Sequence, residues 1–267
     1  MTRPSSPETI AVISDGSALD EESALEPALS AHARWLGDAG FATCTAGLAA
    51  DDLDDALGAL HARCGDVTAY CLVHTRADHA WSIRQTLESA EHAVVTDSDL
   101  RAVVATAQVL TQLRRTGRAT NQSKVLIAGS DELFELGPLL TAVGILDLTF
   151  WKQADAPTFP LARIAEDADV VVDLRAEPDQ DPPMAGEQGP VVIRLPVLAD
   201  SLAVLPGILT ALADTKARRL DVDVLAAVAQ LLSTTTDAGA PLTTPDPGLT
   251  DNIAWAARQA MPHPRGS

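Results

Sequence analysis

Near the middle of a chain of 267 residues lies the segment Val125-Leu126-Ile127-Ala128-Gly129-Ser130-Asp131-Glu132-Leu133-Phe134. It opens with a short run of aliphatic residues, which is typical of a buried strand. The run ends at Gly129, and a helical pattern of apolar residues begins at about Glu132. A strand, a glycine turn and a helix in this order form a βα unit, the building block of a parallel sheet.

In the Rossmann type of βα unit the turn binds the pyrophosphate of a dinucleotide and carries three glycines. The second glycine lets the phosphates approach the backbone, and the third lets the helix pack closely on the strand. Here these two positions hold Asp131 and Phe134. A carboxylate beside the helix N-terminus competes for the positive dipole end that would hold a phosphate. The sequence therefore predicts a degenerate Rossmann-like turn, with Gly129, Ser130 and Asp131 as the remaining candidate cofactor-binding residues.

Strand and helix patterns alternate along the rest of the chain. We expect strands over 9–13, 41–45, 67–73, 92–95, 124–128, 146–151, 170–174 and 191–195, and helices over 24–38, 51–63, 77–89, 99–115, 132–143, 161–166, 201–214, 221–233 and 248–260. This alternation predicts an α/β fold with largely parallel sheets. In the helix over 77–89 we expect Trp81 to lie in the core.

The domain boundaries follow from changes in composition. Gly117 to Ser123 is a polar, glycine-containing connection between two apolar patterns, and it favours a boundary there. We expect a disordered leader, an N-terminal α/β domain, a degenerate Rossmann-like domain and a C-terminal helical segment that packs back on the first lobe. In that order these parts cover residues 1–8, 9–120, 121–200 and 201–267.

Composition excludes several kinds of partner. The apolar content of 46% is enough for a substantial core, while the net charge of −18 makes nucleic acid and anionic membrane surfaces poor partners. No apolar run is long enough to span a bilayer. The cysteines are Cys44, Cys64 and Cys71, an odd number without repeating spacing, which predicts reduced thiols in a cytoplasmic protein.

The ordered elements resemble a bacterial malic enzyme. The similarity begins at Thr9-Ile10-Ala11-Val12-Ile13-Ser14-Asp15-Gly16-Ser17-Ala18, continues through 94–113 and 124–152, and is strongest at Leu205-Pro206-Gly207-Ile208-Leu209. It runs in register from about Thr9 to Ala260. The resemblance implies a two-lobed α/β fold with parallel-rich sheets and an oligomeric assembly.

The resemblance also implies a reaction, the oxidative decarboxylation of malate with NAD or NADP and a divalent metal. Such chemistry needs a general base, a general acid and a cation that polarises the ketone. The family's acid–base tyrosine lies in an N-terminal segment that is absent here, so the chain resembles a truncated member. The family's lysine corresponds to His32, which could act as a substituted base near neutral pH or could simply be a packed helical histidine.

The family's metal ligands are mostly replaced. An adjacent Glu-Asp pair corresponds to Val73 and His74, and only a later aspartate is kept, as Asp97. One carboxylate does not hold magnesium or manganese, which need several oxygen ligands. Asp97 has the alternative role of capping the helix that follows it.

The substrate and cofactor positions differ as well. The family's Gly-Leu-Gly loop corresponds to Asp20-Glu21-Glu22, whose charges would repel a dicarboxylate. The acidic residue that holds the adenosine ribose is replaced by Trp151-Lys152, although Lys152 could accept the 2′-phosphate of NADP. Part of the family's sheet is expected to be deleted between Val197 and Asp200.

Three functional hypotheses follow. The first is a malic-enzyme-like pseudoenzyme without a cofactor, which binds a second copy, another protein or a small molecule. The second is a divergent NAD(P)-dependent oxidoreductase of the malic enzyme type, with His32 or His74 as base. The third is a structural or regulatory subunit that accompanies a metabolic enzyme. A cytoplasmic location is expected for all three.

Overall fold

The computed structural model describes residues 8–48, 53–175, 189–194, 201–235 and 246–261, and the structural statements below concern these ranges. The strands are β1 (Thr9–Ser14), β2 (Ala42–Gly47), β3 (Ala69–Leu72), β4 (Val94–Thr96), β5 (Lys124–Ala128), β6 (Asp147–Trp151), β7 (Val170–Asp173) and β8 (Val191–Arg194). The helices are α1 (Leu25–Asp38), α2 (Leu53–Cys64), α3 (Ala77–Ser89), α4 (Asp97–Arg115), α5 (Leu136–Ala142), α6 (Leu161–Ala165), α7 (Leu205–Thr215), α8 (Val222–Thr235) and α9 (Pro247–Ala260). The expected leader up to residue 7 and the expected deletion at 197–200 lie outside the described residues.

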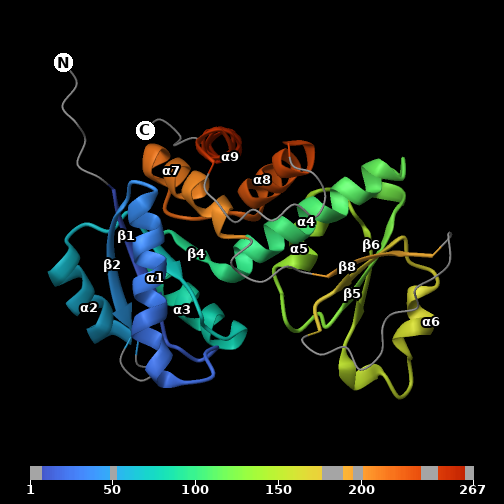
Figure 1. Ribbon diagram of the computed structural model, residues 1–267, viewed down its shortest axis with the longest axis horizontal. Helices are drawn as coiled ribbons and strands as arrows, with labels where there is room; N and C mark the ends of the chain where they lie inside the picture. The colour runs from blue at the N-terminus through green and yellow to red at the C-terminus, as the bar shows by residue number, and fades with distance from the viewer. Residues whose placement is uncertain (1–7, 49–52, 176–188, 195–200, 236–245, 262–267) are drawn as a thin grey trace. The chain divides into compact units, whose positions relative to one another are not determined.

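The strands form two four-stranded parallel sheets, ordered β2-β1-β3-β4 and β6-β5-β7-β8 (Figure 1). In the first sheet Ile10 pairs with Thr43 on one side and with Ala69 on the other. In each sheet the second strand in the chain lies on one side of the first strand, and the third strand lies on its other side. This reversal creates a switch point between the two central strands, where open α/β sheets bind ligands at their carboxyl ends. The predicted α/β fold with two parallel sheets is confirmed.

Contacts divide the chain into two compact units that are discontinuous in sequence. The first holds β1–β4 with α1, α2, α3, α7 and α9, and the second holds β5–β8 with most of α4 and with α5, α6 and α8. Helices α7 and α9 thus pack with the first sheet, as expected of the C-terminal segment. Helix α8 does not, because it contacts α5 and because Thr111 Oγ1 of α4 donates to its Ser233 carbonyl oxygen at 3.2 Å. The grouping by contacts therefore does not follow the linear boundaries drawn from the sequence.

The core of the first unit surrounds its two central strands. All four residues of β3 are buried, and Ile13 and Leu72 pack with Leu60 of α2 and Leu87 of α3. A parallel strand is apolar along its whole length when both faces of the sheet are covered. The expectation that Trp81 lies in this core is wrong: its side chain is 66% exposed, because the buried stripe of α3 runs through neighbouring positions.

Helices α7 and α9 approach each other closely at Gly207. An ideal Cβ built on Gly207 would lie 2.5 Å from Ile253 Cγ2 of α9 and 2.9 Å from the carbonyl oxygen of Thr250. No side chain fits there without a shift, so the glycine of the Leu-Pro-Gly-Ile-Leu segment sets the distance between the two helices. None of the helices in the described ranges is long and apolar enough to cross a membrane.

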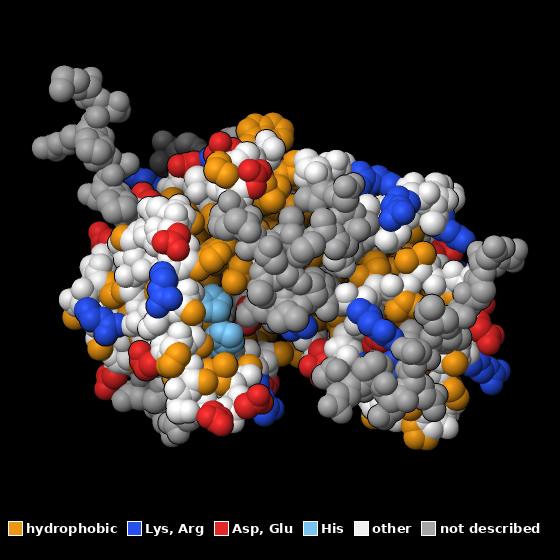
Figure 2. All heavy atoms as spheres, in the orientation of Figure 1, with side chains coloured by type: hydrophobic (Ala, Val, Ile, Leu, Met, Phe, Trp, Pro, Cys, Tyr) orange, Lys and Arg blue, Asp and Glu red, His pale blue; other side chains and the backbone are white. Residues whose placement is uncertain are grey.

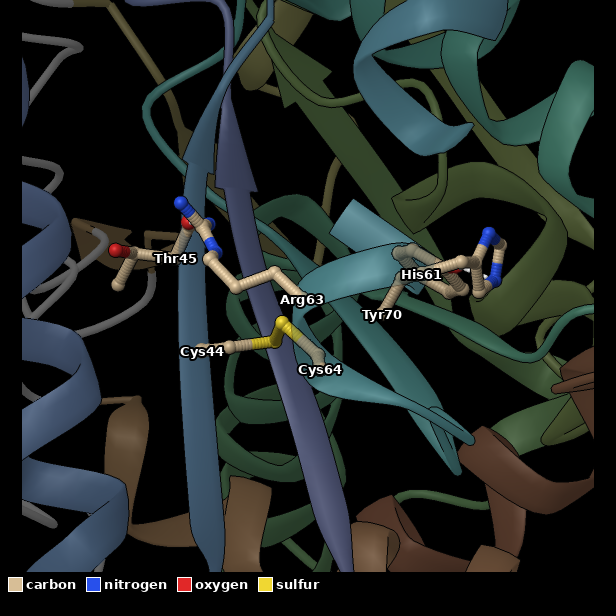
Figure 3. Close-up of a disulfide and its surroundings, with 6 residues drawn as sticks. All are labelled: Cys44, Thr45, His61, Arg63, Cys64 and Tyr70. Atoms are coloured by element: carbon tan, nitrogen blue, oxygen red, sulfur yellow. Dashed lines mark hydrogen bonds between the residues drawn. A yellow bond between two sulfur atoms is a disulfide. The ribbon is translucent and has the colours of Figure 1, made fainter. Parts of the chain in front are cut away.

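The structure joins two of the cysteines that the sequence analysis expected to be reduced. Cys44 of β2 and Cys64 at the end of α2 form a disulfide, with Cα atoms 6.3 Å apart (Figure 3). This separation is within the usual range for a disulfide. The prediction failed because the pair is made between two elements that no spacing motif connects. Cys71 is buried in β3.

Candidate functional site

The carboxyl ends of β1 and β3 form the switch point of the first sheet, and the loops that follow these strands are held together. Ala18 N–H donates to the His74 carbonyl oxygen at 3.2 Å, and Arg76 N–H donates to Ser17 Oγ at 2.9 Å. Ser14 Oγ donates to the same His74 carbonyl at 3.4 Å. The Asp-Gly turn that opens the malic-enzyme-like segment therefore lies against the loop that begins at Val73.

Asp15 is the most strongly hydrogen-bonded carboxylate of this edge. It accepts from the backbone N–H and the hydroxyl of Ser17, at 3.0 and 2.7 Å, and lies 2.6 Å from Nδ1 of His79. Burial acts to raise the pKa of Asp15, but these hydrogen bonds outweigh it and the pKa falls below its ordinary value. Asp15 is thus a buried anion that holds the turn, and His79 is a partner that the sequence analysis missed.

His32, His74 and Asp97 come together beside this turn. The rings of His32 and His74 lie edge to face with centroids 5.0 Å apart, and the His74 backbone N–H donates to Asp97 Oδ2 at 3.0 Å. His32 is buried, and its Nδ1 lies 3.1 Å from the Ala28 carbonyl oxygen, so Nδ1 carries the hydrogen. Nε2 of His32 is buried without a hydrogen-bond partner among the described residues. In Figure 2 the histidines visible on this face gather beside α1.

The electrostatics of the histidine pair favour a neutral His74. Burial lowers the pKa of His74, and the nearby His32 lowers it further. A neutral imidazole can accept a proton, so His74 has the protonation state that a general base needs. Within the described ranges no group of three or more His, Cys, Asp or Glu side chains is placed to hold a metal ion. Asp97 instead uses one carboxylate oxygen to fix the backbone of His74, which has a positive φ of 49°.

The lowered pKa of His74 predicts a pH dependence of stability. In the unfolded chain His74 takes up a proton near its ordinary pKa of 6.5, whereas the folded protein takes it up only at lower pH. The stabilisation is therefore complete above about pH 6.5 and is lost as the pH falls through the lower, folded pKa. We expect His74→Asn, which tolerates a positive φ, to flatten the fall in unfolding free energy between pH 7 and 5 in urea titrations. An unchanged slope would contradict this prediction.

In the turn after β5 in the second unit, the backbone N–H groups are hydrogen-bonded to backbone carbonyl oxygens. Gly129 has a φ of 79°, and the N–H groups of Gly129 and Ser130 both donate to the Trp151 carbonyl oxygen, at 2.8 and 3.3 Å. The N–H of Glu132 donates to the Gly129 carbonyl oxygen at 3.0 Å. The helix that we expected to begin at Glu132 begins at Leu136, because the intervening residues form this turn. Asp131 therefore lies in the turn and not at the helix N-terminus, which corrects the sequence analysis.

Arg175 lies in the switch point of the second sheet. A Cβ added to Gly129 would lie 3.3 Å from the Arg175 backbone nitrogen, so the two loops touch. The Arg175 guanidinium donates two hydrogen bonds to the Asp173 carboxylate, at 2.8 and 2.9 Å, and lies 5.8 Å from the centre of the Trp151 ring. The side chains of Asp173 and Arg175 are only 1% and 8% exposed. The buried Asp173–Arg175 pair thus lies at the carboxyl end of β7, against the turn that follows β5.

Lys152 follows the end of β6, where a dinucleotide-binding unit places its acidic ribose ligand. Its backbone N–H donates to Asp155 Oδ2 at 3.3 Å. The indole of Trp151 is buried, and its Nε1–H donates to the Phe159 carbonyl oxygen at 2.8 Å. Trp151 and Lys152 are therefore both held by hydrogen bonds within the second unit.

The sequence matches no known family model and no curated protein, whereas the fold matches solved structures. A putative malic enzyme (malate oxidoreductase) superposes with a TM-score of 0.74 at 16% identity, covering 95% of this chain and 85% of that one. The NAD-dependent malic enzyme of Thermotoga maritima gives 0.74 at 17% identity, with the same coverage. The malic enzyme of Pyrococcus horikoshii gives 0.70 at 15% identity, covering 94% and 76%. The chain therefore has a malic-enzyme-like fold.

Proposed function

We propose that this chain is a malic-enzyme-like protein that does not decarboxylate malate and acts by binding, as a homo-oligomer, as a partner of another protein, or as a carrier of a small ligand. The observation that carries this proposal is the Asp173–Arg175 pair in the switch point of the second sheet. A dinucleotide could enter only if this buried pair moved. The amides of Gly129 and Ser130, which would face its phosphates, already donate to Trp151.

The first unit supports the same proposal. Oxidative decarboxylation needs a divalent cation on the oxygen of the hydroxy acid, and magnesium or manganese needs several oxygen ligands. The positions that correspond to the family's ligands hold Val73 and His74, and the Asp97 carboxylate holds the His74 backbone. These replacements support a protein that holds neither the dinucleotide nor the metal.

One observation favours an alternative, a divergent NAD(P)-dependent oxidoreductase. His74 is held neutral, and the unpartnered Nε2 of His32 lies next to it, so either ring could take a proton from a hydroxyl group. In that case Gly129, Ser130 and Asp131 would contact the cofactor, Lys152 would favour NADP and Asp97 would contribute to a metal site. The third possibility, a subunit that accompanies a metabolic enzyme, differs from the main proposal only in its partner. The cytoplasm remains the proposed location, although the cysteines no longer argue for it.

A ligand titration followed by thermal unfolding tests the proposal. We expect no shift in Tm with NAD or NADP at millimolar concentration, with or without malate and manganese. A working site would respond clearly, because a ligand present at about 100 times its Kd stabilises the folded state by about 2.7 kcal/mol. The NAD-dependent malic enzyme of Thermotoga maritima is the positive control.

Two outcomes would decide against the proposal. A saturable Tm shift with NAD or NADP would show a cofactor site, and malate turnover by the same preparation would establish the alternative. Asp131→Gly is the matched variant, because it restores one glycine of the dinucleotide turn while leaving the Asp173–Arg175 pair in place. We expect it to remain without response to either dinucleotide.

A further inference from the structure

A cleft lies at the opposite edge of the first sheet, away from the loops described above. It opens at the amino ends of β1, β3 and β4, next to the end of α7, and has a volume of about 550 Å³, which is in the range of sites for small molecules. Its lining includes the imidazoles of His61 and His92, the cations Lys216 and Arg218, and the apolar side chains of Val67 and Leu212.

The rings of His61 and His92 line this cleft, and the ring of Tyr70 packs against both of them. Tyr70 is fully buried, and its hydroxyl lies 2.7 Å from Nε2 of His61 (Figure 3). The His92 ring lies 5.2 Å from that of His61 and 5.1 Å from that of Tyr70, measured between centroids. Burial raises the pKa of Tyr70 to about 12, so the phenol keeps its proton at neutral pH. The cleft therefore presents two imidazoles, of which His61 is held by a hydrogen bond to a neutral phenol.

The charges that act on His92 are positive. Burial lowers the pKa of His92, and the nearby His61 and Arg218 lower it further. The carboxylates of the cleft are those of Glu8, Asp66 and Glu91. Glu8 accepts a hydrogen bond from Thr68 at 2.7 Å, and Glu91 lies 3.8 Å from Arg218 in an ion pair whose side chains are both more than half exposed. Among the described residues, the charged groups that shift the pKa of His92 are therefore His61 and Arg218.

Two residues that line the cleft have a strained, left-handed backbone conformation although they are not glycines. Glu91 and Lys216 have φ values of 60° and 53°. Glu91 follows α3 in a Schellman turn. The Glu91 N–H donates to the Glu88 carbonyl oxygen, and the His92 N–H donates to the Leu87 carbonyl oxygen. The position that Glu91 occupies in such a turn is usually taken by glycine. Non-glycine residues with positive φ concentrate at functional sites. Of the three described in this chain, two line this cleft.

We propose that this cleft binds a small organic anion, whose charged group lies between Arg218, Lys216 and His92 and whose apolar part packs on Val67 and Leu212. The anionic group is a carboxylate or a phosphate, since both accept hydrogen bonds from guanidinium, ammonium and imidazolium groups. A chain with a net charge of −18 does not attract anions in general. Saturable binding of an anion at this cleft would therefore indicate a specific site and not a general attraction of anions to the protein surface. This proposal does not depend on whether the protein is catalytic.

Binding and protonation are coupled in this site. An anion beside His92 favours the charged imidazolium, so the complex takes up a proton that the free protein does not hold at neutral pH. The affinity should increase as the pH falls from 7.5 toward 6, because more of the free protein then has His92 protonated. The other titratable and charged groups that face the cleft are Glu8, Asp66, Glu91, His61, Lys216 and Arg218.

The test is a titration of the full chain with benzoate, phenyl phosphate and neutral benzamide, followed by the imidazole NMR signals of its six histidines. The signals are assigned by single His→Gln substitutions. We expect saturable shifts confined to His61 and His92, with one or both anions and not with benzamide. Comparison of the two anions distinguishes a carboxylate site from a phosphate site.

Three variants make the result specific. Arg218→Gln should weaken binding at least about tenfold, the effect of losing one charge-assisted contact of about 1.4 kcal/mol. Arg219→Gln is the matched control, because Arg219 is equally exposed, pairs with Glu88 and does not line the cleft. Lys216→Gly should weaken binding while unfolding is unchanged or shifts to higher temperature, since glycine adopts the positive φ without strain.

The proposal is overturned by any of three results. The first is the absence of shifts at His61 and His92 with either anion up to about 50 mM, well above a millimolar Kd. The second is an equal response to benzamide. The third is an affinity that Arg218→Gln and Lys216→Gly leave unchanged.

Discussion

Replacing Asp173 by alanine should lower the unfolding free energy of the second unit by about 3–5 kcal/mol, the cost of leaving one member of a buried ion pair without its partner. The Asp173 carboxylate accepts two hydrogen bonds from the Arg175 guanidinium and one from the Arg175 backbone N–H, and it lies 3.8 Å from Arg194. Its side chain is almost completely buried. The Arg175 guanidinium cannot easily move into solvent, because the Arg175 backbone packs against Gly129 and the guanidinium lies over Trp151. Urea titration followed by tryptophan fluorescence would measure the effect.

A double substitution separates the ion pair from the space it fills. We expect Asp173→Leu combined with Arg175→Met to recover most of the lost stability, because a buried pair replaced by apolar side chains of similar size is often neutral. Asp214→Ala is the control for an exposed pair: Asp214 contacts Arg258 at the surface, and its loss should cost about 1 kcal/mol or less. If Asp173→Ala behaved like this control, the pair would not be the buried element that closes the switch point.

Gly207→Ala should lower stability by about 1–3 kcal/mol, the usual cost of forcing extra atoms into a packed interior. The new methyl group would meet Ile253 of α9 at 2.5 Å and the Thr250 carbonyl oxygen at 2.9 Å. Helices α7 and α9 would have to separate, and both lie in the first unit with buried faces. Thermal unfolding by circular dichroism would detect the effect as a lower Tm.

The matched control is Gly37→Ala in α1. An added Cβ at Gly37 meets nothing within 4 Å, so the substitution should be neutral or stabilise by about 0.5–1 kcal/mol through the better helix propensity of alanine. Adding Ile253→Ala to Gly207→Ala should recover part of the loss, although Ile253→Ala alone leaves a cavity that costs about 2–5 kcal/mol. Fully additive effects of the two substitutions would show that they do not share this contact.

The sequence predicted the fold well because the signals that define it are local. The aliphatic run of β5 and the apolar stripe of α4 each decide their own element, and the alternation of such elements leads to parallel sheets. The start of α5 was placed four residues too early because Glu132 uses its amide to close the turn on Gly129. Trp81 was assigned to the core because size and apolarity do not reveal on which side of a helical stripe a residue lies.

Residues of the candidate site could be predicted only where the resemblance to malic enzymes matched them to functional positions of that family. That comparison selected His32, His74 and Asp97, which the structure brings together, although their roles stay a prediction. It did not select Arg175, because a lone arginine two residues after a strand carries no recognisable pattern. The histidines of the cleft and the tyrosine that packs against them were missed for a similar reason. His61, Tyr70 and His92 belong to α2, β3 and the turn before β4, and only tertiary packing makes them neighbours.

The interleaving of the two units has a consequence for how a ribosome delivers the chain. When β8 has been translated, all eight strands of both sheets exist, but α7, which packs on β3 in the first unit, has not been made. The second unit is equally incomplete, since α8 follows α7 in the chain. The surfaces of β3 and α5 that α7 and α8 contact therefore stay uncovered until the last helices emerge from the ribosome.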